Sequence, residues 1–499
     1  MAEHLISRAD AANDLLACAA FLAEDIKNSD GQAEAMTAII PLYLAKGNVD
    51  LAAELANTID DPFMRDRLLI LVAQKCAEID DDEYAMQLAD VVDDYGLRSQ
   101  ARERIAIQKA EQGKCETALE IADVLDHPDS VLSAIAVRQM VDGDEAAAKL
   151  TLSGISFAGA VVSAYSAMAM AIIESGEYAR AAEFLENASE EAGNSEHDEE
   201  KIRTFCEIGN LFIEAKRNDR AIETFDKARA FAETLDNIHR DEFLAAVAVG
   251  FLQAGSSNLA DRTLDSITDK TQISTCLLSF ARDSWKNDDK DDAFDALEES
   301  YAILKSQREN ETRDSQARFR LFSSIAAQFA GFEKGERAIE IAQEIGDEGE
   351  QMSALSQIAQ ILTIQKNDEL AKQAMLAIRD DAARVFALIG TSDAKIKNGE
   401  KENAIAALDE AAALAESVPQ LNLRSSAYNE IARRLYDCGE TAKAREVLRV
   451  SLEIVTAIRS ESSRAVALAQ LAGLFEMMEY QLSDEEKAAM QAMITVNRN

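Results

Sequence analysis

Apolar residues recur along this chain three and four positions apart, in stretches that short polar breaks separate. Residues at this spacing lie on one face of an α-helix, so each stretch predicts a helix with one buried side. The breaks follow one another at intervals of roughly 30 to 46 residues, most of them near 33, the length of one helix–turn–helix repeat. They lie at 46–48, 80–82, 112–114, 142–144, 175–177, 216–218, 254–256, 287–289, 332–335, 365–367, 398–400 and 438–440.

The residues around each break follow a rule of their own. After Gly176, for example, Ala181 comes five residues later, Leu185 nine later and Ala188 twelve later, all on one helical face. Seven residues before the break lies a small residue, here Ala169, which is flanked by larger apolar ones. Small residues facing bulky ones at fixed spacing allow antiparallel helices to interlock. The pattern predicts consecutive pairs of antiparallel helices that share one interior.

This unit resembles the tetratricopeptide repeat, and its best copy is residues 205–228. In that copy Gly209, Phe212, Ala221 and Phe225 occupy the small and aromatic positions of the family. The resemblance implies an all-α protein, a right-handed α-α superhelix of about 12–13 antiparallel helix pairs. The proline that often closes a tetratricopeptide repeat is nearly absent, so a HEAT-like or mixed helical solenoid is the structural alternative.

The repeat pattern covers residues 33–480. We expect residues 1–32 to form N-terminal capping helices, with one or two amphipathic helices in the stretch 2–28, and residues 481–499 to form a C-terminal capping helix. Such caps protect the terminal repeats, which lack a neighbour on one side. Ser483 and Glu486 have the spacing of a capping box, which predicts the start of the last helix.

Charge and hydropathy narrow the classes of partner. The 91 acidic and 51 basic residues give a formal net charge of −40. A field of this sign repels phosphate backbones and anionic lipids, which argues against nucleic acid and membrane surfaces as partners. No stretch approaches the ~20 consecutive apolar residues of a membrane-spanning helix. Glu3, Asp10 and Asp14 lie where a signal peptide has basic and apolar regions, so we expect a cytoplasmic protein.

The sequence contains no recognisable catalytic motif. Its six cysteines and four histidines are scattered singly, without zinc-ligand spacing or a redox CxxC pair. Glycine-rich phosphate loops and the GxSxG nucleophile motif are also missing. We therefore expect no catalytic residue, no metal site and no cofactor.

One acidic run, residues 287–298, imitates a calcium-binding loop in the spacing of its oxygen-bearing side chains. However, Asp292 stands where such a loop needs glycine for its sharp turn. The run also fits the repeat register, and acidic residues favour a helix N-terminus in any case. We interpret it as the start of a repeat helix.

If the resemblance holds, the first helix of each pair lines the concave face of the superhelix. The register places the following candidate partner-binding residues on that face: Arg203, Asn210, Arg282, Trp285, Arg320, Asn429, Arg433 and Tyr436. Tryptophan, tyrosine and arginine are frequent hot spots of interfaces. Arginines within an acidic molecule would select a peptide with apolar and acidic groups. Alternatively, Trp285 and Tyr436 fill gaps between repeats, and the arginines pair with nearby carboxylates.

These observations favour a non-enzymatic scaffold that binds a protein or peptide of unknown identity in its concave groove. A regulatory solenoid that senses a peptide or small ligand is the alternative. An enzyme built on helical repeats is a third possibility, which would need a cluster of acids or bases that the sequence does not reveal.

Overall fold

The computed structural model describes residues 4–306 and 315–496. Over these residues the chain forms 28 helices and no strand. In at least ten of the twelve helix–turn–helix units, the two helices pack directly on each other. The prediction of an all-α protein built as an α-α superhelix of tetratricopeptide-like helix pairs is therefore confirmed.

Twelve pairs follow one another along the chain. The first helices of the pairs are α3 (Ser29–Ala45), α5 (Pro62–Glu78), α7 (Tyr95–Glu111), α9 (Asp129–Val141), α11 (Ala158–Glu174), α13 (Asp198–Glu214), α15 (Arg240–Gln253), α17 (Lys270–Lys286), α19 (Ser315–Gly331), α21 (Glu348–Ile364), α23 (Asp381–Lys397) and α25 (Leu421–Asp437). The second helices are α4 (Val49–Asn57), α6 (Asp82–Asp90), α8 (Cys115–Ala122), α10 (Glu145–Leu152), α12 (Tyr178–Ala192), α14 (Asn218–Thr234), α16 (Ser257–Leu264), α18 (Lys290–Ser306), α20 (Gly335–Gln343), α22 (Asp368–Ala377), α24 (Lys401–Ala415) and α26 (Thr441–Thr456). Four helices lie outside these pairs, namely α1 (Arg8–Ala11), α2 (Leu15–Glu24), α27 (Glu461–Met477) and α28 (Asp484–Val496).

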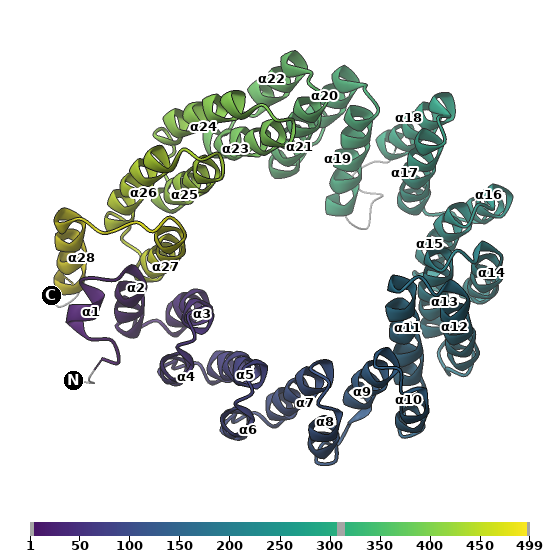
Figure 1. Cartoon of the computed structure of the whole chain (residues 1–499). Coiled ribbons are helices and arrows are strands. Elements are labelled where there is room, and N and C mark those ends of the chain that lie inside the picture. The colour runs from purple at the N-terminus through teal and green to yellow at the C-terminus, as the bar shows by residue number, and fades with distance from the viewer. Residues whose placement is uncertain (1–3, 307–314, 497–499) are drawn as a thin grey trace. The chain divides into compact units, whose positions relative to one another are not determined.

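The helices form two compact units. Unit 1 contains the described parts of residues 1–102 and 355–499, and unit 2 contains the described parts of residues 103–354. In unit 2 the first helices from α9 to α19 pack on one another as one layer, and the second helices cover that layer on one side (Figure 1). Unit 1 has the same two layers, so among residues 4–306 and 315–496 no helix covers the other long face of the first helices in either unit.

Each predicted break is a tight turn at the end of a first helix. A residue in the left-handed conformation lies in all twelve of them, and in seven it is glycine. At Gly176, with φ +83°, the N–H of Glu177 donates to the carbonyl of Ile172 at 3.2 Å. This is the Schellman arrangement, in which a left-handed residue lets the chain satisfy the last carbonyls of a helix. The predicted turn positions are confirmed.

The interior of the best tetratricopeptide-like copy is built around one aromatic ring. Phe225 of α14 is fully buried, and its ring lies against Gly209 of α13 and Gly250 of α15. A methyl group at Gly209 would come within 2.7 Å of the ring. Because both glycines lack a side chain, one phenylalanine packs into two first helices at once.

Three short second helices are accompanied by an aspartate on the first helix of the same pair, which holds the loop that follows them. In α15, Asp241 accepts hydrogen bonds from the backbone N–H groups of Thr268 and Asp269 at 2.8 and 2.7 Å. These groups lie in the loop that follows α16, a helix of only 8 residues. Asp66 holds the loop after α6, a helix of 9 residues, and Asp129 holds the loop after α10, a helix of 8 residues, in the same way.

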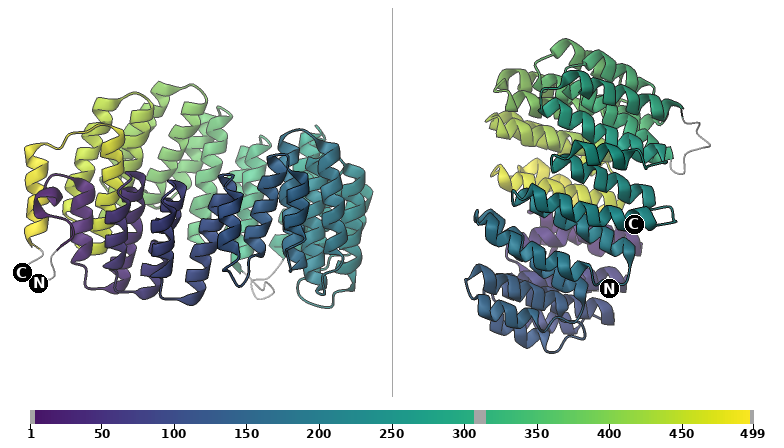
Figure 2. Two further views of the ribbon diagram at one scale, coloured as in Figure 1. Left: turned by 60° about the horizontal axis from the view of Figure 1, so that its bottom comes forward. Right: turned by 90° about the vertical axis from the view of Figure 1, so that its right-hand side faces the viewer.

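Helix α27 continues the layer of first helices after α25, but the helix that pairs with it is not the next one in the chain. It packs on α2 and α3, whereas α28, which follows it in the chain, packs on α26, α2 and α1. In Figure 2 (left) these N-terminal purple helices stand beside the C-terminal yellow ones. We call α2 and α27 together the composite repeat, because residues 15–24 and 461–477 form one helix pair.

The structure corrects the expectation of an amphipathic N-terminal helix. Every residue of α2 from Leu15 to Ala23 is buried. A helix that is apolar on all sides must be covered on all sides, and α1, α3, α27 and α28 cover this one. The predicted boundary after residue 32 falls inside α3, and the one after residue 480 falls between α27 and α28.

The predicted capping box at the last helix is confirmed. The Ser483 N–H donates to Glu486 Oε2 at 2.7 Å, and the Glu486 N–H donates to Ser483 Oγ at 3.3 Å. Residues 1–3 and 497–499 of the two predicted capping segments lie outside the described residues. In the part of the chain that the structure describes, no helix combines the length and apolar character needed to cross a membrane.

Candidate partner-binding face

Four of the eight predicted partner-binding residues are exposed on first helices of unit 2. Arg203 and Asn210 are exposed on α13, and Arg282 and Arg320 are exposed on α17 and α19. The helices α17 and α19 pack directly on each other, so Arg282 and Arg320 lie on neighbouring helices. Helix α15 lies between α13 and α17, so Arg203 and Asn210 of α13 are separated from Arg282 by one helix.

The helices α17 and α19 both carry a net positive charge, although the chain as a whole is strongly acidic. They carry five basic residues, Lys270, Arg282, Lys286, Arg318 and Arg320, against the single acidic residue Asp283. Their second helices show the opposite balance. In α18 and α20, three basic residues (Lys290, Lys305 and Arg337) face seven acidic ones (Asp291, Asp292, Asp295, Glu298, Glu299, Glu336 and Glu340).

Three exposed cations define what we call the basic face, namely Arg282, Lys286 and Arg320. Across residues 4–306 and 315–496, none of the three has an ion-pair partner. Arg337 of α20 shows the contrast, because it pairs with Glu298 at 2.9 Å and with Glu340 at 3.2 Å. Its hydrogen bond with Glu298 holds the pKa of Arg337 above the ordinary arginine value. Acidic side chains of the second helices thus pair with Arg337, whereas the three cations of the basic face have no such partner among the described residues.

Trp285 lies at the joint between the two helices of the basic face. Its half-buried ring stacks on Phe332, which follows α19, with ring centroids 4.4 Å apart. It also meets Phe294 of α18 edge-on at 5.8 Å. Trp285 therefore packs in the gap between two repeats, which was the alternative to a role in partner binding. Its contacts hold α17 against the following helix pair.

The three candidates in unit 1 belong to α25 and have different environments. Arg433 is exposed and pairs with Glu430 at 3.2 Å, and Tyr436 is half-buried. Asn429 is a correction to the predicted face, because only 5% of it is exposed. Its Oδ1 atom accepts a hydrogen bond from Ser451 Oγ of α26 at 2.7 Å. This position faces the second helix, so Asn429 connects α25 with α26.

The thiols near the candidate residues are not reactive groups. Burial raises the pKa of Cys206 on α13 to about 12, and burial raises the pKa of Cys276 on α17 to about 12. At neutral pH both thiols stay protonated, and the protonated thiol is a poor nucleophile. They are packing residues of the first helices.

The acidic run at residue 287 forms an ordinary repeat turn. Asp288 adopts the left-handed conformation with φ +62°, and α18 begins at Lys290. Repulsion from Asp289 raises the pKa of Asp292. No group of three or more histidine, cysteine, aspartate or glutamate side chains suited to a metal ion occurs within the described parts of the chain.

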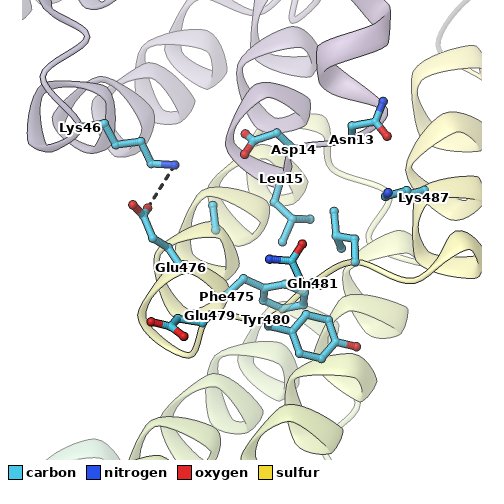
Figure 3. A pocket seen from close by; sticks show the side chains of 12 residues that line it. Asn13, Asp14, Leu15, Lys46, Phe475, Glu476, Glu479, Tyr480, Gln481 and Lys487 are labelled. Atoms are coloured by element: carbon cyan, nitrogen blue, oxygen red, sulfur yellow. Dashed lines mark ion pairs between the residues drawn. The ribbon is translucent and has the colours of Figure 1, made fainter.

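A pocket lies at one edge of the composite repeat, where the other repeats have their turn. Its volume is about 560 Å³. Figure 3 shows the start of α2 on one side of it and the end of α27 on the other. The labelled lining residues are Asn13, Asp14, Leu15, Lys46, Phe475, Glu476, Glu479, Tyr480, Gln481 and Lys487. Lys46 Nζ and Glu476 Oε2 form an ion pair of 3.1 Å across it.

Sequence reasoning did not single out Lys286 or the buried position of Asn429. Lys286 has a signal in the sequence, because it follows Arg282 by one helical turn on a helix with a single acid. The composite repeat also has a signal. Residues 15–23 contain no charged side chain, and such a helix cannot be the polar outer cap of a stack.

No protein-family model matches this sequence, and no curated protein sequence matches it. Among solved structures, the chain is similar to Ton1535 from Thermococcus onnurineus NA1, with 18% identity over 70% of this chain and 97% of that chain and a TM-score of 0.26. It is also similar to the APC/C hetero-tetramer Cut9–Hcn1, with 14% identity, 90% and 92% coverage and a TM-score of 0.23. A third structure is the apo form of the quorum sensor NprR from B. thuringiensis, with 13% identity, 65% and 97% coverage and a TM-score of 0.25. Likenesses of this strength carry no argument about function or partner.

Proposed function

We propose that this chain is a non-catalytic, cytoplasmic interaction scaffold that binds an acidic and partly apolar segment of a protein partner on the basic face. The supporting observation is the charge contrast between the first helices α17 and α19 and their second helices α18 and α20. Two neighbouring first helices carry five basic residues against one acidic residue, in a chain whose net charge is −40. Oppositely charged surfaces that meet suppress wrong partners and guide the right one.

The absence of ion pairs at Arg282, Lys286 and Arg320 makes them suitable contacts. A carboxylate of the partner gains charge-assisted hydrogen bonds there, and no existing ion pair within the described residues has to break first. Arginine offers two parallel N–H donors to a carboxylate, so Arg282 and Arg320 also restrict its orientation.

The partner needs apolar side chains as well. Val249 and Leu252 are half-buried on α15, the helix beside α17. A partner that covers them gains hydrophobic free energy in addition to its ionic contacts. Exposed ion pairs contribute only about 0.2–1 kcal/mol each, so we expect modest affinity that falls as salt is added.

Selection from an unbiased library of short random peptides tests this proposal without a known partner. We expect the captured peptides to be enriched in aspartate and glutamate together with leucine or phenylalanine. The double substitution Arg282→Glu and Arg320→Glu should lower the affinity for the captured peptides by about tenfold or more, because it replaces attraction with repulsion at two contacts.

Arg449→Glu provides the matched control. Arg449 is an exposed arginine of α26, a second helix of unit 1, and the substitution changes the charge in the same sense. Its variant should retain peptide affinity. A captured pool without acidic bias, or equal weakening by the control substitution, would contradict the proposal.

A further inference from the structure

The two segments of unit 1 are joined to each other by one apolar seam. The chain connects residues 1–102 with residues 355–499 only through unit 2. The helix packing that holds these two segments together is α27 on α2 and α3, with α28 on α1 and α2. We define the seam as the contacts of α27 and α28 with α1, α2 and α3. The two segments of unit 1 therefore stay together only as long as these contacts form.

The seam consists mainly of apolar contacts, which do not require a particular orientation of the two partners. The buried residues of α27 are all apolar, among them Ala465, Leu468 and Phe475, and residues 15–23 of α2 are all apolar and buried. Lys46 and Glu476 form an ion pair across it, but the Glu476 side chain is 60% exposed. Exposed ion pairs contribute little. The free energy of the seam comes from apolar burial, which does not depend on which copy supplies each helix.

No turn connects the two helices of the composite repeat, in contrast with the twelve other pairs. The position of that turn is the pocket of about 560 Å³ in Figure 3. A second pocket of about 470 Å³, lined by residues 25–28 and 460–462 among others, lies where the loops at the other edge meet. At neither edge does a connection force α27 to pair with the α2 of its own chain.

We propose that the seam also joins two copies of this chain. In this arrangement α27 of one copy packs on α2 and α3 of a second copy, and α27 of the second packs on the first. Each copy then completes the unit 1 of the other. The same contacts form in the monomer and in this segment-exchanged dimer, so protein concentration during folding decides between them.

A disulfide across the seam tests the proposal in the full chain. A Cβ atom built at Gly31 of α3 lies 3.3 Å from the Cβ of Ser462 of α27. This is close to the separation of about 3.5–4.5 Å that a disulfide requires. The double variant Gly31→Cys with Ser462→Cys is oxidised as a dilute native monomer, which locks the seam within one copy. Peptide mapping confirms the bond and shows that the variant folds.

The locked variant and the wild type are then unfolded in urea and refolded over a range of protein concentrations. Light scattering should show a dimer fraction that rises with concentration for the wild type and for the reduced double variant. The oxidised variant should remain monomeric at every concentration. A wild type that refolds only to monomer overturns the proposal, as does a dimer that forms equally from the locked chain.

A mixture of the two single variants identifies the contact directly. Chains with Gly31→Cys and chains with Ser462→Cys are mixed in urea, refolded at high concentration and oxidised. In an exchanged dimer the two introduced thiols meet only between copies, so up to half of the dimer, the statistical share of mixed pairs, should become covalently linked. A dimer without this linkage would be held by some other surface, and the seam would not be its interface.

Discussion

At the scale of single residues, the packing of unit 2 depends on two positions that have no side chain. The ring of Phe225 lies against Gly209 and Gly250, which belong to two neighbouring first helices. The sequence predicted the roles of Gly209 and Phe225 within one repeat. It did not predict the contact with Gly250, because the next repeat carries no pattern that points to a ring from the previous one.

We predict that Gly209→Ala destabilises unit 2. The added methyl group would lie 2.7 Å from the Phe225 ring, and overpacking of this kind costs about 1–3 kcal/mol. Gly473→Ala in α27 is the matched control, because nothing lies within 4 Å of its added methyl group. That variant should gain up to about 1 kcal/mol of helix propensity. Urea unfolding of both variants measures the difference, and equal midpoints would contradict the prediction.

Asp241 predicts a dependence of stability on pH. Burial alone would raise its pKa, but hydrogen bonds from Thr268, from the Asp269 N–H and from Arg240 outweigh it, so the pKa of Asp241 lies below its ordinary value. A carboxyl group whose pKa is lower in the folded chain stabilises folding when it is ionised. Its contribution is complete above the unfolded pKa of about 3.9, and it is lost as the pH falls through the folded pKa.

The variant Asp241→Asn removes this titration. We expect it to be less stable than the wild type by about 0.5–1.5 kcal/mol at neutral pH, because the backbone N–H groups of Thr268 and Asp269 lose a charged acceptor. The difference should shrink below about pH 4. Fluorescence of Trp285, the single tryptophan of the chain, follows the unfolding of unit 2. A difference that grows on acidification would show that another group controls the effect.

At the scale of helices, the sequence predicts those features that depend only on residues within one repeat. A left-handed residue in each turn and a small residue at each helix crossing lie within one repeat, so their spacing shows in the sequence. The partner of α2 was not predictable in this way. Its burial signal is present in residues 15–23, but nothing in those residues identifies α27 among the other first helices.

We predict that a charge placed in α2 disrupts unit 1 and leaves unit 2 folded. Ala20 is fully buried, and Ala20→Asp would place a carboxylate among apolar helices at a cost of more than about 4 kcal/mol. Hydrogen exchange followed by mass spectrometry should show lost protection in α3 and α27 but not in α13. Ala488→Asp, at an exposed position of α28, is the control. Full protection of α27 in the Ala20 variant would contradict the composite repeat.

At the scale of the whole molecule, the net charge of −40 determines the response to salt. The acidic side chains repel one another in the compact state, and salt screens this repulsion over a Debye length of about 10 Å at 0.1 M. The many ion pairs of the second helices would weaken under the same conditions, but exposed pairs contribute little.

We therefore predict that added sodium chloride raises the free energy of unfolding at neutral pH. The measurement is urea unfolding at low and at high salt, followed by circular dichroism. At pH values near the isoelectric point of about 4.5 the net charge is small, so the benefit of salt should disappear there. A loss of stability with salt at neutral pH would mean that the ion pairs outweigh the repulsion.

The pairing of α2 with α27 also has a consequence for the order in which the chain is made. During translation α2 leaves the ribosome about 440 residues before α27 does, which at roughly 5–20 residues per second is about 20 to 90 seconds. Throughout that interval the apolar residues 15–23 of α2 have only the neighbouring helices of the nascent chain for cover. A nascent-chain chaperone that shields residues 15–23 until translation finishes would keep these residues from aggregating with other chains.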